Sequence, residues 1–145
     1  MTDTTRPTPD APLVLPAGAG ELIAIGGAEV VVKAAAPRVT FADYTAPAGF
    51  PGPPLHVHPA FDEVFYVLDG TLTVRLRDAV HEVAAGGTAF VPGAVPHTFA
   101  NEAASPLRFL AVCAPGGFER YVRALAADDA EALAAITASV GYAPA

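Results

Sequence analysis

The sequence of 145 residues contains one cysteine, four histidines, no tryptophan and only 16% charged residues. A single cysteine cannot form an intramolecular disulfide, so a disulfide-stabilised secreted domain is excluded. The first residues have neither the basic nor the apolar region of a signal peptide, and we therefore expect a cytoplasmic protein. No apolar run approaches the roughly 18 residues that a membrane-spanning helix needs.

Basic residues are also scarce. Eight Lys and Arg against fifteen Asp and Glu give a net charge of -7, which would repel the phosphates of nucleic acid or an anionic membrane surface. We therefore expect neither nucleic acid nor a membrane as a partner. The composition includes 52% hydrophobic residues, 13 Gly and 15 Pro, which is typical of a turn-rich folded protein of one domain rather than a disordered chain.

Short runs of β-branched and aromatic residues alternate with turn residues through most of the chain, a rhythm typical of an all-β sandwich, barrel or jelly roll. We expect a flexible N-terminal tail at residues 1–12, the barrel at residues 13–115 and a helical extension packed on it at residues 116–145. The expected strands are ELIAI, EVVVK, RVTFADYT, LHVH, EVFYVLD, GTLTVRLR, AVHEV, TAFV, HTFAN and PLRFLAVCA.

Two helical patterns follow the barrel segment. Asp128, three residues before Glu131, has the spacing of a capping box and predicts the start of the second helix, which Gly141 would end. We expect both helices to pack on the outside of the sheets, although an arm exchanged with a dimer partner would give the same pattern. The apolar stripes are Phe118, Tyr121, Val122 and Leu125 in the first helix, and Leu133, Ile136 and Val140 in the second.

Two of the four histidines lie one residue apart in LHVHPAFDEVFYVLDG, which spans residues 55–70. Side chains in an extended segment alternate between two faces, so His56 and His58 leave the same face and can converge on one ion. Glu63 can place its carboxylate beside them if the next strand pairs with this one. Phe65 and Val67 share the face of Glu63 and would floor an apolar pocket.

A third imidazole follows a turn rich in glycine and proline in GGTAFVPGAVPHTFAN, which spans residues 86–101. His97 begins the strand after this turn. Phe99 and Asn101 share the face of His97, so the sequence predicts that they line the same pocket.

The two segments resemble the paired motifs of the cupin superfamily. The first motif is Gly, five residues, His-x-His, three or four residues, Glu, six residues, Gly; the second is Gly, five residues, Pro-x-Gly, two residues, His, three residues, Asn. Phe50 and Ala94 stand where these motifs have glycine, and a shift of the glycine by one residue within each turn is the expected explanation. The matching positions are His56, His58, Glu63 and Gly70 in the first motif, and Gly86, Pro92, His97 and Asn101 in the second.

The resemblance covers residues 20–115 and implies a double-stranded β-helix, or jelly-roll, barrel. It also implies one divalent transition metal ion, which could be Fe, Ni, Mn, Co, Cu or Zn, because imidazole and carboxylate suit all of them. We expect Glu63 to be the catalytic base as well as a ligand, since an apolar pocket would raise its basicity. The implied metal ligands are His56, His58, Glu63 and His97.

The helical tail is similar to that of small single-domain cupins grouped loosely with quercetin dioxygenases. We expect a small-molecule substrate and a homodimer. The favoured function is a dioxygenase for an apolar, aromatic or enolic metabolite. The alternatives are a metal-dependent isomerase or polyketide-type cyclase that uses no dioxygen, and a cupin that binds a metabolite without turnover. A barrel that keeps the pattern without binding metal is a further alternative.

Other polar residues are expected to lie outside the site. Asp62 competes with Glu63 as a ligand, but the motif spacing favours exposure of Asp62. Cys113 lies in an apolar strand and is expected to be a buried small hydrophobe. A surface position is favoured for Arg38, Asp43, Tyr44 and His81.

Overall fold

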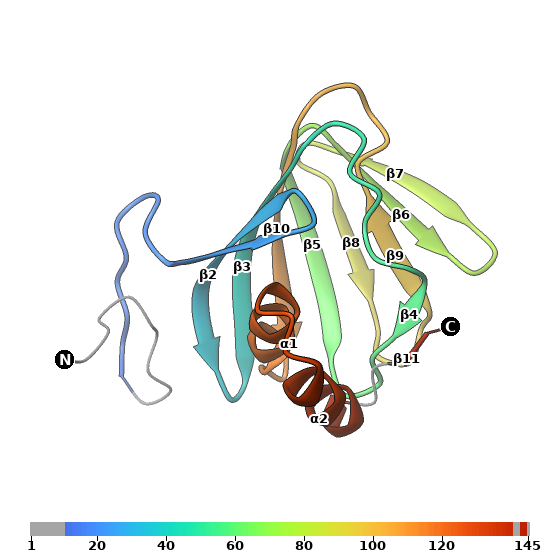
Figure 1. Cartoon of the computed structure of the whole chain (residues 1–145). Helices are drawn as coiled ribbons and strands as arrows, with labels where there is room; N and C mark the ends of the chain where they lie inside the picture. Colours follow the sequence, from blue (N-terminus) through green and yellow to red (C-terminus); the bar gives the residue numbers. More distant parts are fainter. Residues whose placement is uncertain (1–10, 141–142, 145) are drawn as a thin grey trace.

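The computed structural model describes residues 11–140 and 143–144. Two antiparallel sheets face each other and enclose the core (Figure 1). One sheet has the strand order β1-β2-β3-β10-β5-β8 and the other β11-β4-β9-β6-β7, so the prediction of an all-β jelly-roll barrel is confirmed. The strands are β1 (Glu21–Ile25), β2 (Ala28–Ala36), β3 (Val39–Ala46), β4 (His56–Val57), β5 (Asp62–Asp69), β6 (Thr71–Leu76), β7 (Val80–Ala84), β8 (Thr88–Val91), β9 (His97–Ala100), β10 (Leu107–Ala114) and β11 (Ala143–Pro144).

The alternation of side chains along β5 explains how the barrel is filled. Glu63, Phe65 and Val67 point inward and are buried, whereas Tyr66 and Leu68 on the opposite face are exposed. The strand lies between β10 and β8 in the larger sheet, so its inward residues reach the middle of the barrel. The same strand therefore supplies both core side chains and a carboxylate.

The observed strands follow the expected ones closely, with two informative differences. The expected strand LHVH is reduced to two residues in β4, in which His56 pairs with His97 of β9. In addition, the sequence does not predict β11, which is antiparallel to β4 and pairs Ala143 with Val57. The C-terminal end of the chain thus borders the strand that carries the first histidine.

Helix α1 (Phe118–Ala126) is attached to the larger sheet at two points. Its buried Glu119 accepts hydrogen bonds from the Thr40 hydroxyl (2.6 Å) and from the Gly117 amide (3.1 Å). One turn later, the Arg123 guanidinium donates to both carboxylate oxygens of Glu21 in β1, at 2.6–3.0 Å. Bonds between groups of opposite charge are the stronger kind of hydrogen bond, so α1 has a fixed position against the barrel.

Helix α2 (Ala130–Val140) begins one residue later than predicted. Asp128 adopts a left-handed φ of 52° and its amide bonds to the Leu125 carbonyl, so it terminates α1. The side chain of Asp129 instead accepts a hydrogen bond from the Ala132 amide (3.0 Å) and caps α2. In the described part of the chain, neither helix is long and apolar enough to cross a membrane.

Three expectations from the sequence fall on residues outside the described part of the chain. They are the first ten residues of the expected tail, the end of the second helix at Gly141, and the place of the Val140 side chain in the apolar stripe.

The turn before His97 differs from the sequence expectation that the glycine of the second motif has shifted by one residue, from position 94 to Gly93. The Val95 amide bonds to the Pro92 carbonyl, and Ala94 occupies the third position of this turn with a φ of 69°. Gly93 is required for another reason, because a Cβ there would lie 2.8 Å from the Pro59 carbonyl oxygen. The left-handed conformation therefore stays at residue 94, where alanine replaces the glycine of the motif.

Candidate metal centre and adjoining cavity

The structure brings three histidines together inside the barrel. His56 lies in β4, His97 begins β9 opposite it, and His58 follows the end of β4. All three side chains are buried, and one ligand atom from each lies within 4.8 Å of the others. Residues separated by about forty positions in the chain therefore meet because β4 and β9 are neighbours.

Backbone carbonyls fix the orientation of two of the imidazoles. The Nδ1 atom of His56 is 2.8 Å from the Pro54 carbonyl oxygen, and the Nδ1 atom of His97 is 2.9 Å from that of Val95. A carbonyl can only accept, so each Nδ1 carries the proton. The Nε2 atom of each neutral ring can then bind a cation, as in metal sites whose histidines are held by outer hydrogen bonds.

His58 is held differently. Its ring stacks on Phe61, with the ring centroids 4.2 Å apart and an interplanar angle of 19°. Its Nε2 atom lies 3.1 Å from the Nε2 atom of His97. Among the described residues, its buried Nδ1 atom has no hydrogen-bond partner, so packing rather than a carbonyl orients this ring.

Glu63 lies against two of the three histidines. Its Oε2 atom is 3.0 Å from Nε2 of His58 and 3.5 Å from Nε2 of His97. Glu63 is not part of the group of ligand atoms that lie within 4.8 Å of one another, which contains only the histidines. The carboxylate therefore lies beside the histidine cluster, in contact with His58 and His97.

The electrostatics of Glu63 differ from the sequence expectation. Burial by itself would raise the pKa of Glu63, but hydrogen bonds and attraction from His58 and His97 outweigh burial and lower the pKa to about 2. The expectation of raised basicity was wrong for the metal-free site because it considered the apolar surroundings without the two imidazoles. The carboxylate is therefore ionised at neutral pH.

The two imidazoles that bond to backbone carbonyls respond to the site in opposite ways. Burial lowers the pKa of His56 to about 4. Burial also acts to lower the pKa of His97, but the hydrogen bonds to Glu63 and to the Val95 carbonyl raise it. The ionised Glu63 therefore favours positive charge at His97, which either a proton or a metal cation can supply.

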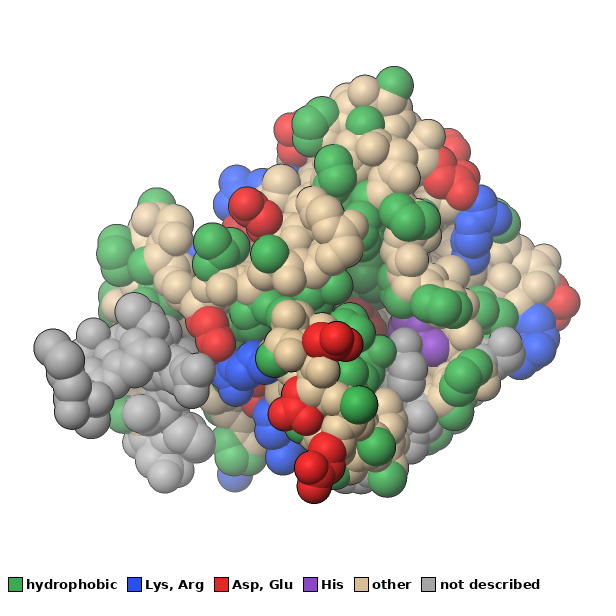
Figure 2. Space-filling model, viewed as in Figure 1, with side chains coloured by type: hydrophobic (Ala, Val, Ile, Leu, Met, Phe, Trp, Pro, Cys, Tyr) green, Lys and Arg blue, Asp and Glu red, His purple; other side chains and the backbone are tan. Residues whose placement is uncertain are grey.

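An apolar cavity of about 270 Å³ opens beside the cluster. His56 and Glu63 are part of its wall, and none of the described residues that line it is Lys or Arg. In the space-filling view, histidine surface is visible at a hollow bordered by hydrophobic side chains (Figure 2). Its apolar wall includes Ile25, Val30, Phe50, Phe99, Phe118, Val122 and Leu125.

The four residues expected to line the pocket have different positions. Phe99 lies in the cavity wall, whereas Phe65 and Val67 are fully buried and pack in the core. Asn101 is also fully buried, and its amide group donates to the carbonyls of Pro47 (3.0 Å) and Ser105 (2.8 Å). Asn101 therefore holds together the loops around the cavity and does not line it.

Two parts of the cavity wall were not predicted from the sequence. Tyr44 was expected at the surface but is buried in the wall, with 7% of its surface exposed. Asp43, also expected at the surface, is buried outside the wall, where its carboxylate accepts hydrogen bonds from the Arg108 guanidinium. The apolar stripe of α1 was recognised, but the sequence did not show that it faces the cavity. Arg38 is exposed, as expected.

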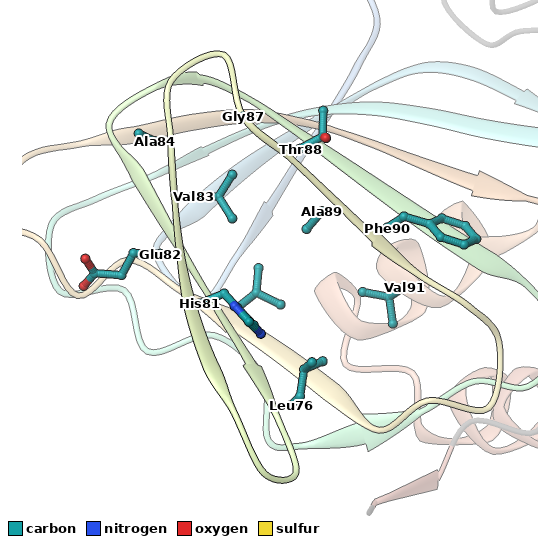
Figure 3. Close-up of a pocket in the computed structure, with 11 residues that line it drawn as sticks. Leu76, His81, Glu82, Val83, Ala84, Gly87, Thr88, Ala89, Phe90 and Val91 are labelled. Atoms are coloured by element: carbon teal, nitrogen blue, oxygen red, sulfur yellow. The ribbon is translucent and has the colours of Figure 1, made fainter.

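A second hollow of about 470 Å³ lies between β7 and β8, at the edges of the two sheets (Figure 3). Its lining is mostly apolar and includes Val83, Ala89 and Phe90. His81 and Glu82 are its ionisable residues, and as neighbours in a strand they point to opposite faces. His81 is exposed, as expected, and this hollow carries no convergent set of ligands.

The comparisons with known proteins agree with the fold and with the motif positions. Residues 43–113, which include all three clustered histidines and Glu63, match the cupin domain family. An uncharacterized protein of Methanocaldococcus jannaschii is 33% identical over 61 residues, which cover 42% of this chain and 49% of that protein. The chain therefore matches only about half the length of this curated relative.

Two solved structures extend the comparison. The protein TT1209 of Thermus thermophilus is 37% identical, with a TM-score of 0.51 over 55% of this chain and 74% of that chain. An RmlC-like cupin of Shewanella frigidimarina is 18% identical, with a TM-score of 0.68 over 77% of this chain and 98% of that chain. The latter likeness shows the fold alone.

Proposed function

The chain belongs to the cupin superfamily, and we propose that it is a mononuclear metal-dependent enzyme acting on a small apolar, aromatic or enolic metabolite. The observation that carries this proposal is the arrangement of Nε2 of His58, Nε2 of His97 and the Glu63 carboxylate, which face one another at 3.0–3.5 Å inside the barrel. Groups that bear lone pairs or negative charge are stable at such distances only with a cation or a proton among them.

The residues present fit a transition metal ion. The nitrogens of His56, His58 and His97 would hold the ion and Glu63 would be the fourth ligand, a donor set that suits Fe, Ni, Mn, Co, Cu or Zn. When bound, such an ion lowers the pKa of a coordinated hydroxyl group and polarises a carbonyl. The remaining steps depend on side chains of this chain.

The cavity supports the proposed class of substrate. Because none of the described residues in its wall is Lys or Arg, these residues offer no cationic side chain for the charge of a phosphate or a second carboxylate. Its volume of about 270 Å³ is at the small end of the range for ligand pockets. Aromatic side chains such as Phe50 and Phe99 would pack against a flat apolar ring.

Glu63 is the proposed proton acceptor. Its Oε2 atom lies 3.0–3.5 Å from the Nε2 atoms of His58 and His97 that would hold the ion, so it can reach the proton of an enol or phenol hydroxyl bound there. Loss of that proton leaves an electron-rich carbon for attack by dioxygen, and Glu63 can later return the proton. We therefore favour a dioxygenase reaction of the quercetinase type.

Metal analysis of the purified protein tests the centre. We expect one equivalent of metal in the wild type and in His81→Ala, which changes an exposed histidine outside the centre, and none in His56→Ala or His97→Ala, which should remain folded. A full equivalent in His97→Ala would contradict the assignment.

Oxygen uptake tests the reaction. If the protein is a dioxygenase, the metal-loaded form should consume oxygen when 3-hydroxyflavone is added, and the metal-free form should not. Product formation without oxygen uptake would instead indicate an isomerase or cyclase, and tight binding without turnover would indicate a binding protein.

We also propose that the protein works in the cytoplasm as a homodimer. The outer face of the larger sheet exposes Tyr66 (42%), Leu68 (38%) and Phe90 (62%) on the paired strands β5 and β8, and exposed apolar patches often mark interfaces. Analytical ultracentrifugation should find a dimer for the wild type and a monomer for Phe90→Lys. A monomeric wild type would refute the proposal.

A further inference from the structure

Tyr44 is an aromatic residue in the cavity wall whose ring orientation is fixed by neighbouring rings. It lies on β3 and stacks on Phe109, with centroids 4.9 Å apart and an interplanar angle of 15°. Phe99 meets it edge-on at 6.0 Å and 83°. A ring held on two sides has little freedom to turn, so the direction of its hydroxyl group is set by the core.

The hydroxyl group of Tyr44 has no hydrogen-bond partner among the described residues, although only 7% of the residue's surface is exposed. The residue lines the same cavity as His56 and Glu63. Burial first, and then the charge of Glu63, raises the pKa of Tyr44, so the phenol keeps its proton. An unused donor of this kind is costly unless a ligand or water satisfies it.

We propose that the Tyr44 hydroxyl donates a hydrogen bond to an oxygen atom of the ligand that occupies the cavity beside the histidine cluster. This inference rests on the proposed function, because it requires a ligand at that position. Tyr44 is then a positioning residue that selects ligands with an oxygen acceptor next to an apolar ring, such as an enolate or a hydroxyketone. A ligand without that oxygen would leave the donor unpaired.

The composition of the cavity makes Tyr44 specific in this role. Among the described residues of the wall, the polar side chains besides Tyr44 are those of His56, Glu63 and Tyr121. His56 and Glu63 belong to the metal centre, and neither is a hydrogen-bond donor toward the ligand when its metal-binding atom is deprotonated. Tyr121 lies on α1 and stacks on Phe118 with centroids 5.7 Å apart, so the donor on the barrel itself is Tyr44.

The test compares Tyr44→Phe with Tyr66→Phe, which removes a hydroxyl from the exposed face of β5. Phenylalanine keeps both ring contacts of Tyr44, so the variant should fold, bind the metal and unfold at a similar temperature. Each protein is loaded with Co(II), and dissociation constants are measured from the visible spectrum for acetohydroxamate, 3-hydroxyflavone and imidazole. The first two carry oxygen acceptors, whereas imidazole bound through one nitrogen has only an N–H donor left.

We expect Tyr44→Phe to weaken the binding of acetohydroxamate and 3-hydroxyflavone by roughly 3- to 10-fold, the effect of one neutral hydrogen bond, and to leave the binding of imidazole unchanged. Tyr66→Phe should change none of the three. Equal affinities of wild type and Tyr44→Phe for both oxygen ligands would overturn the inference. If acetohydroxamate alone binds and is weakened, the role of Tyr44 stands and the aromatic substrate class fails; a wild type that takes up no metal overturns both proposals.

Discussion

Replacing Ala94 with glycine should stabilise the protein, which is the opposite of the usual effect of glycine. Ala94 is exposed and has a φ of 69°, in a turn closed by the bond from the Val95 amide to the Pro92 carbonyl. Such turns favour glycine at the third position. A left-handed conformation costs an L-residue roughly 1–2 kcal/mol, and Ala94→Gly removes this cost. The greater entropy of glycine in the unfolded chain offsets about 0.5–1 kcal/mol of the stability gained.

The net expectation for Ala94→Gly is therefore a gain of about 0.5–1 kcal/mol, or a rise of roughly 1–4 °C in melting temperature for a chain of this length. Urea denaturation of the metal-free protein measures the gain. Ala24→Gly is the matched control, because Ala24 is exposed in β1 without a positive φ and should lose about 0.5–1 kcal/mol. The reasoning fails if both variants change stability in the same direction.

Three further changes test other parts of the structure. Burial lowers the pKa of His56 to about 4 in the folded protein, so as the pH falls below about 6.5 this histidine takes up a proton in the unfolded chain first. Between pH 7 and 5, the free energy of unfolding of the metal-free wild type should therefore fall by about 2 kcal/mol because of His56. His56→Gln has no titratable group at this position, so urea denaturation should show a weaker dependence of its unfolding free energy on pH. An equal pH dependence in wild type and variant would refute this role of His56. Gly52→Ala places a Cβ 1.6 Å from the Phe99 carbonyl oxygen and should cost roughly 2–4 kcal/mol in thermal unfolding, more than Gly49→Ala, whose Cβ would meet nothing within 4 Å. Arg123→Ala should lose roughly 1–2 kcal/mol in urea denaturation by releasing α1 from β1, and Arg123→Lys less; equal losses would show that the paired guanidinium bonds are unimportant.

The motif residues could be predicted because their geometry is local. His56 and His58 share a face through the two-residue period of an extended chain, and the bond from each Nδ1 of His56 and His97 goes to a carbonyl two residues earlier. The spacing of these residues in the sequence therefore determines where their imidazole rings lie and, in part, how the rings are oriented. The alternation along β5 likewise predicted that Glu63 points inward with Phe65.

Spacing did not distinguish cavity wall from core. Phe65 and Val67 share the face of Glu63, yet they are fully buried beneath the cavity, whereas Phe99 reaches it. Which inward residue meets solvent or ligand depends on how far the two sheets separate at that level. That separation is a property of the assembled barrel and leaves no periodic signal in one strand.

Tyr44 and α1 show a related limit. On β3, Tyr44 alternates with Ala42 and Ala46, which are also buried, so the pattern was compatible with an inward tyrosine. The sequence interpretation favoured the surface because the phenol is polar and no partner for it was evident. The cavity supplies the reason that a polar group is tolerated there, and part of its wall comes from α1, which the bonds of Glu119 and Arg123 hold against the larger sheet.

The chemistry of Glu63 depends on contacts that arise only when distant segments meet. Apolar neighbours alone would have made it a stronger base, but His58 and His97 lie within 3.5 Å of its carboxylate and reverse the direction of the shift. The register that pairs His56 with His97 brings this about, since it sets the third imidazole level with the first two. The same cross-strand pairing that assembles the proposed metal ligands therefore reverses the effect of burial on the pKa of Glu63 in the metal-free site.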